Sequence, residues 1–388
     1  MAIAVLNPGR DKRVHYGHPW VYRSDIHHVT GAFTPGDVIE VHSSHGKFIG
    51  RARFNPASQI ALRFFTVHDE PVDEAFIRMR VRRAIGYRRA FADLKSCRLI
   101  FAESDGLPGL VADAFGDVIV IQSLALGIDR WKATIIDELA SMLNPRGIWE
   151  RSDVKVRELE GMAQTQGLLR GEVPDRVEII ENGVRFLVDV KQGQKTGYFL
   201  DQKENRAAIA PFAKGARVLD CFTHTGAFAL HAAHYGAAEV VGVDISALAL
   251  EQAAENARLN GLSVAFEEAN AFDLLRAQYD AKTRYDMIIL DPPAFTKTRS
   301  AVEAALRGYK EINLRAMKMI RDGGYLVTCS CSHHVLPEAF AKMLVSAASD
   351  AKVQLRQIEA RTQGRDHPIL SASPETQYLK CHILQVYK

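Results

Sequence analysis

The sequence has few cysteines, no strong excess of either charge and no long run of apolar residues. Its five cysteines are spread over 388 residues without the spacing of a disulfide framework, which indicates reduced thiols and a cytoplasmic location. No apolar stretch reaches the length of a membrane span, and the first residues lack the apolar core of a secretory signal. We therefore expect neither a disulfide-stapled secreted domain nor a membrane protein.

What is present is the composition of a soluble globular protein, with 47% hydrophobic and 24% charged residues. The formal net charge of +3 permits nucleic-acid binding but does not require it. The length is too great for one ordinary core and indicates two or three domains. Differences in pattern along the chain predict three of them, at residues 1–70, 71–185 and 186–388.

Residues 1–70 are short apolar runs broken by turn residues, and alternation at 37–41 and 46–54 predicts two strands of a hairpin. We expect a small, β-rich, barrel-like domain. One stretch combines basic and aromatic side chains, which can clamp phosphates and stack bases. A solvated loop beside a core tryptophan explains it equally well. The residues concerned are Arg10, Lys12, Arg13, His15, Trp20, Tyr22 and Arg23.

Residues 71–185 begin with the pattern of a long amphipathic helix. Its apolar side is provided by Phe76, Met79, Val81 and Ile85. Between residues 71 and 98 there are eight basic and three acidic residues, and the simplest interpretation is a solvated charged face. Strand patterns and a second amphipathic helix at 129–143 complete a compact α+β module.

Residues 186–388 alternate apolar strands with helices, which predicts a parallel sheet covered on both faces. The helix pattern at 246–261 opens on Ser246 as N-cap and closes on Gly261. No clear helix joins the last two strands, so one of them is a candidate for an antiparallel strand. The candidate strands are residues 217–220, 239–243, 264–268, 285–290, 325–329, 354–360 and 378–386.

The loop after the first of these strands is the first place to expect a ligand, because ligands of such sheets bind at the carboxyl ends of strands. The loop is not the Gly-x-Gly-x-x-Gly of dinucleotide enzymes, which argues against NAD. Asp220 ends the strand and Gly226 leads into a helix. The second strand ends at Asp244, whose carboxylate can accept hydrogen bonds from both hydroxyls of a ribose. The pair of aspartates predicts a nucleoside-containing cofactor.

The fourth strand ends in Asp-Pro-Pro-Ala-Phe at residues 291–295. Prolines fix φ and remove N–H donors, so a rigid turn would leave carbonyl groups free to face an amino group. Phe295 offers a face on which a base could stack. A stiff loop without a ligand is the alternative.

The fifth strand ends in Thr-Cys-Ser-Cys-Ser at residues 328–332. Cys-x-Cys alone is a poor zinc signal, although His333 and His334 follow. Burial as small hydrophobes would explain a strand cysteine. Cys329 and Cys331 have the same parity, so alternation cannot separate them if the strand runs through both. Cys331 lies further out, where a thiolate can reach a ligand held by Asp291.

Several motifs together resemble the bacterial large-subunit (23S) ribosomal RNA cytosine-C5 methyltransferase family over nearly the whole chain. They are Leu-Asp-Cys-Phe-Thr-His-Thr-Gly-Ala-Phe (219–228), the strand ending at Asp244, Asp-Pro-Pro-Ala-Phe, Arg-Gly-Tyr-Lys-Glu-Ile-Asn (307–313) and the segment 323–332. The resemblance implies an RNA-binding PUA domain, an α+β linking module and a class I S-adenosylmethionine (SAM) domain. This domain is Rossmann-like and seven-stranded, with its last strands partly antiparallel. The partner it implies is ribosomal RNA; homodimer formation is left open.

The resemblance also implies roles for individual residues. Cys331 would be the nucleophile, Asp291 its acid partner, and Cys329 a packing residue. The cofactor would be held by Asp220, Phe222, Thr225, Gly226, Asp244, Ile245, Asn270, Ala271, Asp291 and Gln202. The RNA would be contacted by Pro292, Pro293, Phe295, Lys195 and Arg206. No metal is implied.

The chain departs from related enzymes at two positions. Asn270 stands where many class I methyltransferases have an acidic residue for the adenine amino group, and its amide oxygen can still accept that bond. Pro293 stands where related enzymes for other RNAs have a second cysteine, so Cys331 would act alone and the base that completes the reaction is not identified.

Carbon 5 of cytosine is a poor nucleophile, and a thiolate that adds to carbon 6 activates it. A carboxylic acid at Asp291 could assist through N3. Two other functions fit part of the pattern. Asp-Pro-Pro-Phe also suits methylation of an exocyclic amino group, which has no use for Cys331. A non-catalytic RNA-binding assembly factor could retain the same fold.

Overall fold

The computed structural model describes residues 1–193 and 195–388, and it divides the chain into two compact units. The first unit comprises Met1–Ile179, Val188–Leu200 and Arg365–Thr376. The second comprises Ile180–Leu187, Asp201–Gly364 and Gln377–Lys388. The first two predicted domains lie in the first unit, apart from residues 180–185, which belong to the second. The three-domain division itself stays a prediction.

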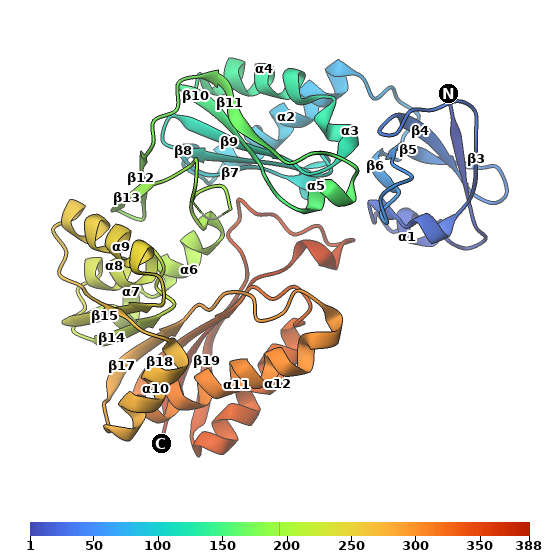
Figure 1. Cartoon of the computed structure of the whole chain (residues 1–388). Helices are drawn as coiled ribbons and strands as arrows, with labels where there is room; N and C mark the ends of the chain where they lie inside the picture. Colours follow the sequence, from blue (N-terminus) through green and yellow to red (C-terminus); the bar gives the residue numbers. More distant parts are fainter. Residues whose placement is uncertain (194) are drawn as a thin grey trace. The chain divides into compact units, whose positions relative to one another are not determined.

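The N-terminal part of the first unit is a six-stranded sheet in the order β2-β6-β5-β4-β1-β3. Figure 1 draws this part in blue. β4 and β5 form the predicted hairpin, because Val38 pairs with Arg53 and His42 with Phe48 in antiparallel register. The turn residue Gly46 adopts φ +76°, which glycine tolerates without strain. The strands are β1 (Ile3–Leu6), β2 (Trp20–Val21), β3 (Ile26–Thr30), β4 (Val38–His42), β5 (Phe48–Phe54) and β6 (Leu62–Thr66), with helix α1 (Lys12–His15) between β1 and β2.

The rest of the first unit is built on a five-stranded sheet in the order β11-β10-β9-β8-β7, in which only β9 and β10 run parallel. Its strands are β7 (Ser96–Phe101), β8 (Leu110–Phe115), β9 (Val118–Ser123), β10 (Gly147–Ser152) and β11 (Thr165–Gly171). The helices are α2 (Glu74–Arg89), α3 (Leu126–Asp129), α4 (Lys132–Leu143) and α5 (Val156–Leu159). Both amphipathic helices are therefore confirmed.

The predicted apolar side of α2 was wrong at one position, Met79. Phe76, Val81 and Ile85 are buried, but the side chain of Met79 is 42% exposed. At 100° per residue Met79 lies off the stripe formed by Ile77, Val81 and the residues one turn further on. The charged side of α2 is more ordered than a solvated face, because Arg78 and Arg82 both bind Glu138.

The second unit contains a seven-stranded sheet in the order β16-β15-β14-β17-β18-β20-β19, the order of a class I methyltransferase (Figure 1). All seven predicted strands are confirmed. β20 pairs antiparallel with both β18 and β19, which confirms the expected antiparallel strand. The strands are β14 (Arg217–Cys221), β15 (Glu239–Asp244), β16 (Ala265–Glu268), β17 (Tyr285–Leu290), β18 (Ile320–Ser330), β19 (Gln354–Arg361) and β20 (Lys380–Tyr387).

Helices cover both faces of this sheet, which explains why its central strands are apolar throughout. One buried cluster joins Leu219, Ile288 and Leu326 to helices on one face, and another joins Val218, Ile289 and Val327 to helices on the opposite face. The helices are α6 (Lys203–Ala208), α7 (Ala210–Ala213), α8 (Ala227–His234), α9 (Ala247–Leu259), α10 (Ala271–Asp280), α11 (Val302–Met319) and α12 (Pro337–Ala351). Strands β12 (Val177–Glu181) and β13 (Val184–Val188) form a separate hairpin.

Helix α9 begins and ends as the sequence predicts. The Ser246 hydroxyl accepts a hydrogen bond from the Ala249 backbone N–H, and Gly261 follows with φ +63°. No helix of the described residues is long and apolar enough to cross a membrane.

Candidate active site at the carboxyl edge of the seven-stranded sheet

The predicted site residues of the second unit gather where four neighbouring strands end. β15, β14, β17 and β18 are parallel neighbours, so their carboxyl ends meet at one edge of the sheet. Cys221 pairs with Val243 on one side and Leu290 on the other. The register brings the ends of the first, second and fourth predicted strands together, as expected for a ligand site in an open α/β sheet.

The loop after β14 turns sharply into α8. Phe222 and His224 have φ of +65° and +51°, and Gly226 has φ +83°. A Cβ on Gly226 would lie 3.1 Å from Ala253 Cβ, so the loop also packs closely against α9. Left-handed conformations of non-glycine residues persist only when their surroundings impose them, and they cluster at ligand sites. Thr225 is buried, and its carbonyl accepts from Asn256 Nδ2 at 3.3 Å.

Asp220 is a buried carboxylate that is only half satisfied. Its Oδ2 accepts from Thr223 Oγ1 at 2.5 Å and from the Ala229 N–H at 2.9 Å, whereas its Oδ1 has no hydrogen-bond partner in the described protein. Burial raises the pKa of Asp220 to about 7, and the negative charges of Asp291 and Asp244 add to the increase. A buried acceptor with nothing to bind indicates a place for a ligand donor.

Asp244 anchors the same loop. Its Oδ2 accepts from the His224 backbone N–H at 2.9 Å, and its Oδ1 accepts from the Ser246 N–H at 3.0 Å. The next side chain, Ile245, is 70% exposed although it is large and apolar. An exposed apolar side chain beside a carboxylate suits a nucleoside. The base would pack against Ile245, and the ribose hydroxyls would donate to Asp244.

Asn270 serves as the N-cap of α10. Its Oδ1 accepts from the Phe272 backbone N–H at 2.9 Å, so the amide oxygen already has one donor. The following residue, Ala271, is buried. A carbonyl oxygen has two acceptor sites, so the predicted contact between Asn270 and an adenine amino group remains compatible with the cap.

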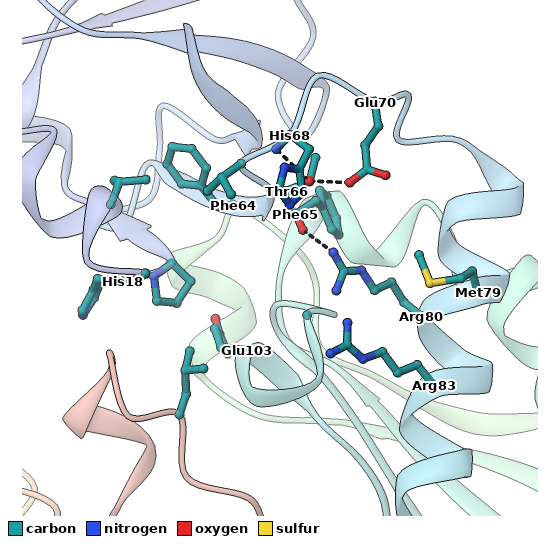
Figure 2. Close-up of a pocket in the computed structure, with 16 residues that line it drawn as sticks. His18, Phe64, Phe65, Thr66, His68, Glu70, Met79, Arg80, Arg83 and Glu103 are labelled. Carbon is teal, nitrogen blue, oxygen red and sulfur yellow. Dashed lines mark hydrogen bonds between the residues drawn. The ribbon is translucent and has the colours of Figure 1, made fainter.

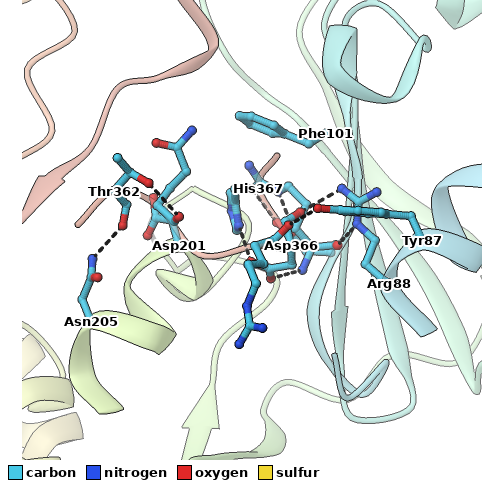
Figure 3. Close-up of polar contacts among 12 residues, drawn as sticks. Tyr87, Arg88, Phe101, Asp201, Asn205, Thr362, Asp366 and His367 are labelled. Carbon is cyan, nitrogen blue, oxygen red and sulfur yellow. Dashed lines mark hydrogen bonds and ion pairs between the residues drawn. The ribbon is translucent and has the colours of Figure 1, made fainter. Parts of the chain in front are cut away.

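A chain of polar side chains leads to Asp291. Gln202 Nε2 donates to Asp291 Oδ1 at 2.9 Å, and Gln202 Oε1 accepts from Asn205 Nδ2 at 2.6 Å. Asn205 Oδ1 accepts from Arg361 Nε at 2.9 Å. Figure 3 shows Asn205 also bonded to the Thr362 carbonyl. Gln202, which was predicted to bind the cofactor, is buried, and its hydrogen bond orients the Asp291 carboxylate.

The Asp-Pro-Pro-Ala-Phe loop is rigid but differs from the prediction in its aromatic ring. Pro292 is buried and Pro293 exposed. The ring of Phe295 lies 4.4 Å from that of Tyr309 and 5.8 Å from that of Phe272, centroid to centroid. Phe295 is thus packed against α10 and α11 of this chain, which does not favour the predicted stacking on a base.

The two cysteines of β18 are separated by the end of the strand. Cys329 is fully buried opposite Cys381 of β20, which agrees with a packing role. Burial raises the pKa of the Cys329 thiol well above its usual value. β18 ends at Ser330, so Cys331 leaves the ladder; it is half-buried, and its Sγ lies 3.9 Å from the Pro292 carbonyl oxygen. The strand end places Cys331 beside the residue that follows Asp291.

Two residues near Cys331 escaped the sequence analysis. Lys380, the first residue of β20, donates from Nζ to the Ser332 carbonyl at 2.7 Å. Tyr309 of α11 is fully buried, and its hydroxyl lies 2.9 Å from Ser332 Oγ. The sequence offered two signals for them, a lysine near the start of the predicted strand 378–386 and a tyrosine in the motif 307–313.

The two predicted RNA contacts of 194–206 take different places. Arg206 is buried in the second unit, where its Nη1 binds Glu181 Oε1 at 2.6 Å, so it is used internally. Lys195 belongs to the first unit, and its Nζ lies 4.4 Å from the Phe199 ring centroid. Both residues belong to the segment 194–206, whose first residue, Gln194, lies outside the described residues.

The carboxylates at the edge of the sheet fit a cationic cofactor that contains a ribose. Asp220, Asp244 and Asp291 are close enough to influence one another electrostatically. SAM carries an ammonium and a sulfonium, so three carboxylates and an unpartnered Asp220 oxygen suit it. Among residues 1–193 and 195–388, no group of three or more His, Cys, Asp and Glu side chains is arranged to hold a metal ion.

The first unit contains a cavity of its own, of about 470 Å³ (Figure 2). It is lined by β6, α2 and residues 17–19, and Figure 2 shows Arg80 and Arg83 of α2 beside it. Arg80 donates to the Phe65 carbonyl at 3.1 Å, and its Nε is buried without a partner. No hydrogen bond or ion pair is found for Arg83 within the described chain. The carboxylate of Glu103, also in the lining, already binds Trp20 and Arg63.

Comparison with protein families identifies two separate parts of the chain. Residues 160–368 match the S-adenosylmethionine-dependent methyltransferase family, and residues 4–67 match the PUA-like domain. A protein of Shewanella denitrificans described as ribosomal RNA large subunit methyltransferase I is 44% identical over the full length of both chains. A protein of Erwinia tasmaniensis with the same description is 41% identical over 97% of each.

Solved structures support the same fold at lower identity. A structure described as a SAM-dependent methyltransferase from Streptococcus mutans superposes with a TM-score of 0.84 at 19% identity, over 99% of this chain and 100% of that one. A second, SMU.776 in complex with SAH, superposes with a TM-score of 0.86 at 19% identity, again over 99% and 100%. At this identity the agreement concerns the fold.

Proposed function

This chain belongs to the ribosomal RNA large subunit methyltransferase I family of SAM-dependent methyltransferases, and on that premise we propose that it methylates carbon 5 of a cytosine in large-subunit ribosomal RNA, with Cys331 as nucleophile. The reaction takes place in the cytoplasm, where its five cysteines, all free in the structure, stay reduced.

The position of Cys331 carries the proposal. It is the first residue beyond β18, half-buried, with Sγ 3.9 Å from the carbonyl of the residue after Asp291. The other four cysteines are buried, and two of them, Cys221 and Cys329, have pKa values raised by burial, which leaves them as unreactive thiols. A methyltransferase directed at an amino group has no need for a single accessible thiol at this place.

In the proposed reaction the Cys331 thiolate forms a bond to carbon 6 of cytosine, and the electron pair released moves onto carbon 5. The Asp291 carboxyl group faces N3 and stabilises the charge that develops there, while Gln202 keeps that carboxyl group in one orientation. Asp220, Asp244 and Ile245 hold the cofactor, which supplies an electrophilic methyl group when bound. Loss of the C5 proton then allows the carbon 6–sulfur bond to break and restores Cys331.

A paired cytosine does not expose carbon 6, so the target must be unstacked before it can reach the thiol. We propose that the first unit holds the RNA while this happens. The PUA-like match at residues 4–67 and the side chain of Arg83 beside the cavity support this role. Many other basic residues of this unit are bound internally: Arg10 to Asp25, Arg13 to Glu375, and Arg78 to Glu138.

Covalent capture tests the proposal directly. RNA transcribed with 5-fluorocytidine should form an adduct with the wild-type protein that survives denaturation, because fluorine cannot leave carbon 5 as a proton does. Cys331→Ala should form no adduct and should transfer no tritiated methyl group, whereas Cys329→Ala, on the same strand, should retain the adduct. Unchanged methyl transfer by Cys331→Ala would favour methylation of an amino group instead.

Two measurements complete the test. Mapping of modified nucleotides in ribosomal RNA from cells with and without the protein should show one 5-methylcytosine that depends on it. Calorimetry with SAM should show binding to the isolated protein, and the absence of binding would indicate a scaffold that retains only the fold.

A further inference from the structure

Lys380 is a buried ammonium group without a carboxylate partner. Its side chain is 4% exposed, and Nζ donates to the carbonyl oxygens of Ser332 at 2.7 Å and Tyr378 at 2.9 Å. No ion pair of Lys380 is found within the described residues. A buried charge that is not paired is costly, and a hydrophobic side chain of the same length would fill this place at lower cost.

The backbone explains why this ammonium lies near the proposed nucleophile. Lys380 pairs with Ser330 across the antiparallel ladder of β18 and β20, and its Nζ reaches past the end of β18 to the carbonyl of Ser332. Cys331 is the residue between Ser330 and Ser332. The two backbone positions that Lys380 contacts therefore enclose Cys331.

The electrostatics agree with this geometry. Burial lowers the pKa of Lys380 to about 8, and Cys331 is the charge that acts in the opposite direction. The interaction is reciprocal, since a thiolate that favours the ammonium is itself favoured by it. Two groups near Cys331 oppose the thiolate: the Tyr309 hydroxyl of α11 interacts with it, and Asp291 precedes Pro292, whose carbonyl lies 3.9 Å from Sγ. His333 and His334 follow on the same loop. His382, two residues along β20, has a pKa lowered by burial, which disfavours its charged form.

We infer that Lys380 is a positioning residue that holds the Cys331 side chain as a thiolate and fixes the loop carrying it through the Ser332 carbonyl. The inference rests on the proposed function for the use of that thiolate. Lys380 contributes the positive charge that a protonated histidine supplies in other thiol enzymes. It is not assigned to the removal of the C5 proton, because both of its located contacts are donated to carbonyl groups.

The test is the rate at which iodoacetamide alkylates Cys331, measured from pH 6 to 10 and localised by peptide mapping. Without RNA or cofactor, the wild type should react as a thiol ionised well before an ordinary cysteine. In Lys380→Met the inflection should move up by about one pH unit, which is a roughly tenfold slower reaction at pH 7. Lys380→Arg keeps the charge and should keep most of the wild-type profile. Lys342→Met removes an exposed lysine of α12 and should leave the profile unchanged.

Superimposable profiles for Lys380→Met and the wild type would overturn the inference. If Lys380→Met does not fold, the reciprocal measurement decides. The pKa of dimethylated Lys380 can be measured by an NMR titration that extends above pH 8. It should be lower in Cys331→Ser than in the wild type, because serine supplies no negative charge, and equal pKa values would overturn the inference. Failure of this inference can be distinguished from failure of the proposed function. Methyl transfer by Cys331→Ala would disprove the proposed function, whereas the alkylation profile of Cys331 tests the effect of Lys380 in either case.

Discussion

Two buried carboxylates, one in each unit, show the difference between a structural site and a binding site. Asp113 on β8 and Asp220 at the end of β14 are 0% and 1% exposed. Asp113 receives Arg98 Nε and Nη2 at 2.8 Å each and Thr196 Oγ1 at 2.6 Å, so its charge and both oxygens are satisfied. Among the described residues Asp220 has no ion pair, and its Oδ1 has no hydrogen-bond partner. Asp113 therefore stabilises the fold, whereas the proposed role of Asp220 is to bind a ligand.

The largest effect should follow from breaking the satisfied pair. Asp113→Ala leaves Arg98 half-buried without its bidentate partner, which costs about 3–5 kcal/mol in the free energy of unfolding. Urea unfolding followed by circular dichroism measures it. SAM affinity per folded molecule should not change; a loss of affinity as large as that of an Asp220 variant would remove the distinction between the two carboxylates.

Asp220→Asn should have the opposite effects, a loss of SAM affinity without a loss of stability. The amide keeps the volume but loses the charge that a cationic cofactor needs, so the dissociation constant for SAM, measured by calorimetry at pH 8, should rise about 30- to 100-fold, or about 2–3 kcal/mol. The free energy of unfolding without cofactor should stay level or increase. Binding equal to that of the wild type would show that the unpartnered oxygen is not part of the cofactor site.

The pH dependence of stability sharpens the comparison. The pKa of Asp220 is raised to about 7 in the folded protein, against 3.8 when unfolded, so folding favours the protonated form. Its stabilisation is complete below about pH 4, decreases as pH rises, and is lost above about pH 7. The free energy of unfolding of the wild type, taken relative to that of Asp220→Asn, should therefore decrease by roughly 2 kcal/mol between pH 5 and pH 7.5, as measured by urea unfolding without cofactor, so the advantage of the variant grows with pH. A constant difference would contradict the raised pKa.

A similar contrast, between a paired side chain and one without a partner found, occurs among the arginines of α2. It should have the smallest effect of these predictions. Arg82 binds Glu138 at 2.5 Å, whereas its neighbour Arg83 has no partner found within the described residues. Arg83→Ser should weaken binding of a ribosomal RNA fragment by threefold to tenfold and reduce the salt dependence by about 0.7 in slope, as for one phosphate contact. Arg82→Ser is the matched control. Equal losses in filter binding would show that α2 acts only through its net charge.

Much of the second unit could be predicted because its strands are short apolar runs bounded by helices with clear caps. The first, second and fourth strands each end in an aspartate, and parallel pairing alone requires Asp220, Asp244 and Asp291 to meet at one edge. The meeting of these three aspartates at one edge could therefore be predicted from the sequence. Met79 was misplaced because a local apolar pattern does not show which neighbour covers it.

Other parts of the site depended on contacts far apart in the sequence. The base contact expected of Phe295 stays a prediction, and the sequence did not show that α11 supplies Tyr309 as a ring partner. The RNA contact expected of Arg206 also stays a prediction, and the sequence did not show that the hairpin of β12 and β13 supplies Glu181 as its ion-pair partner. Lys380 was overlooked because nothing near it in the sequence shows that antiparallel pairing brings it to residues 330–332.

The sequence by itself determined which residue types stand at the strand ends, since the periods of strands and helices and the caps of α9 are local properties of the chain. Strand alternation treats Cys331 and Cys329 alike, so the sequence favoured Cys331 only through its outer position and the family resemblance. The tertiary structure gives the physical difference, because β18 ends at Ser330 and Cys329 is buried against Cys381. Exposure and electrostatic environment are set by segments brought together in space, and these decide which thiol and which carboxylate remain available for chemistry.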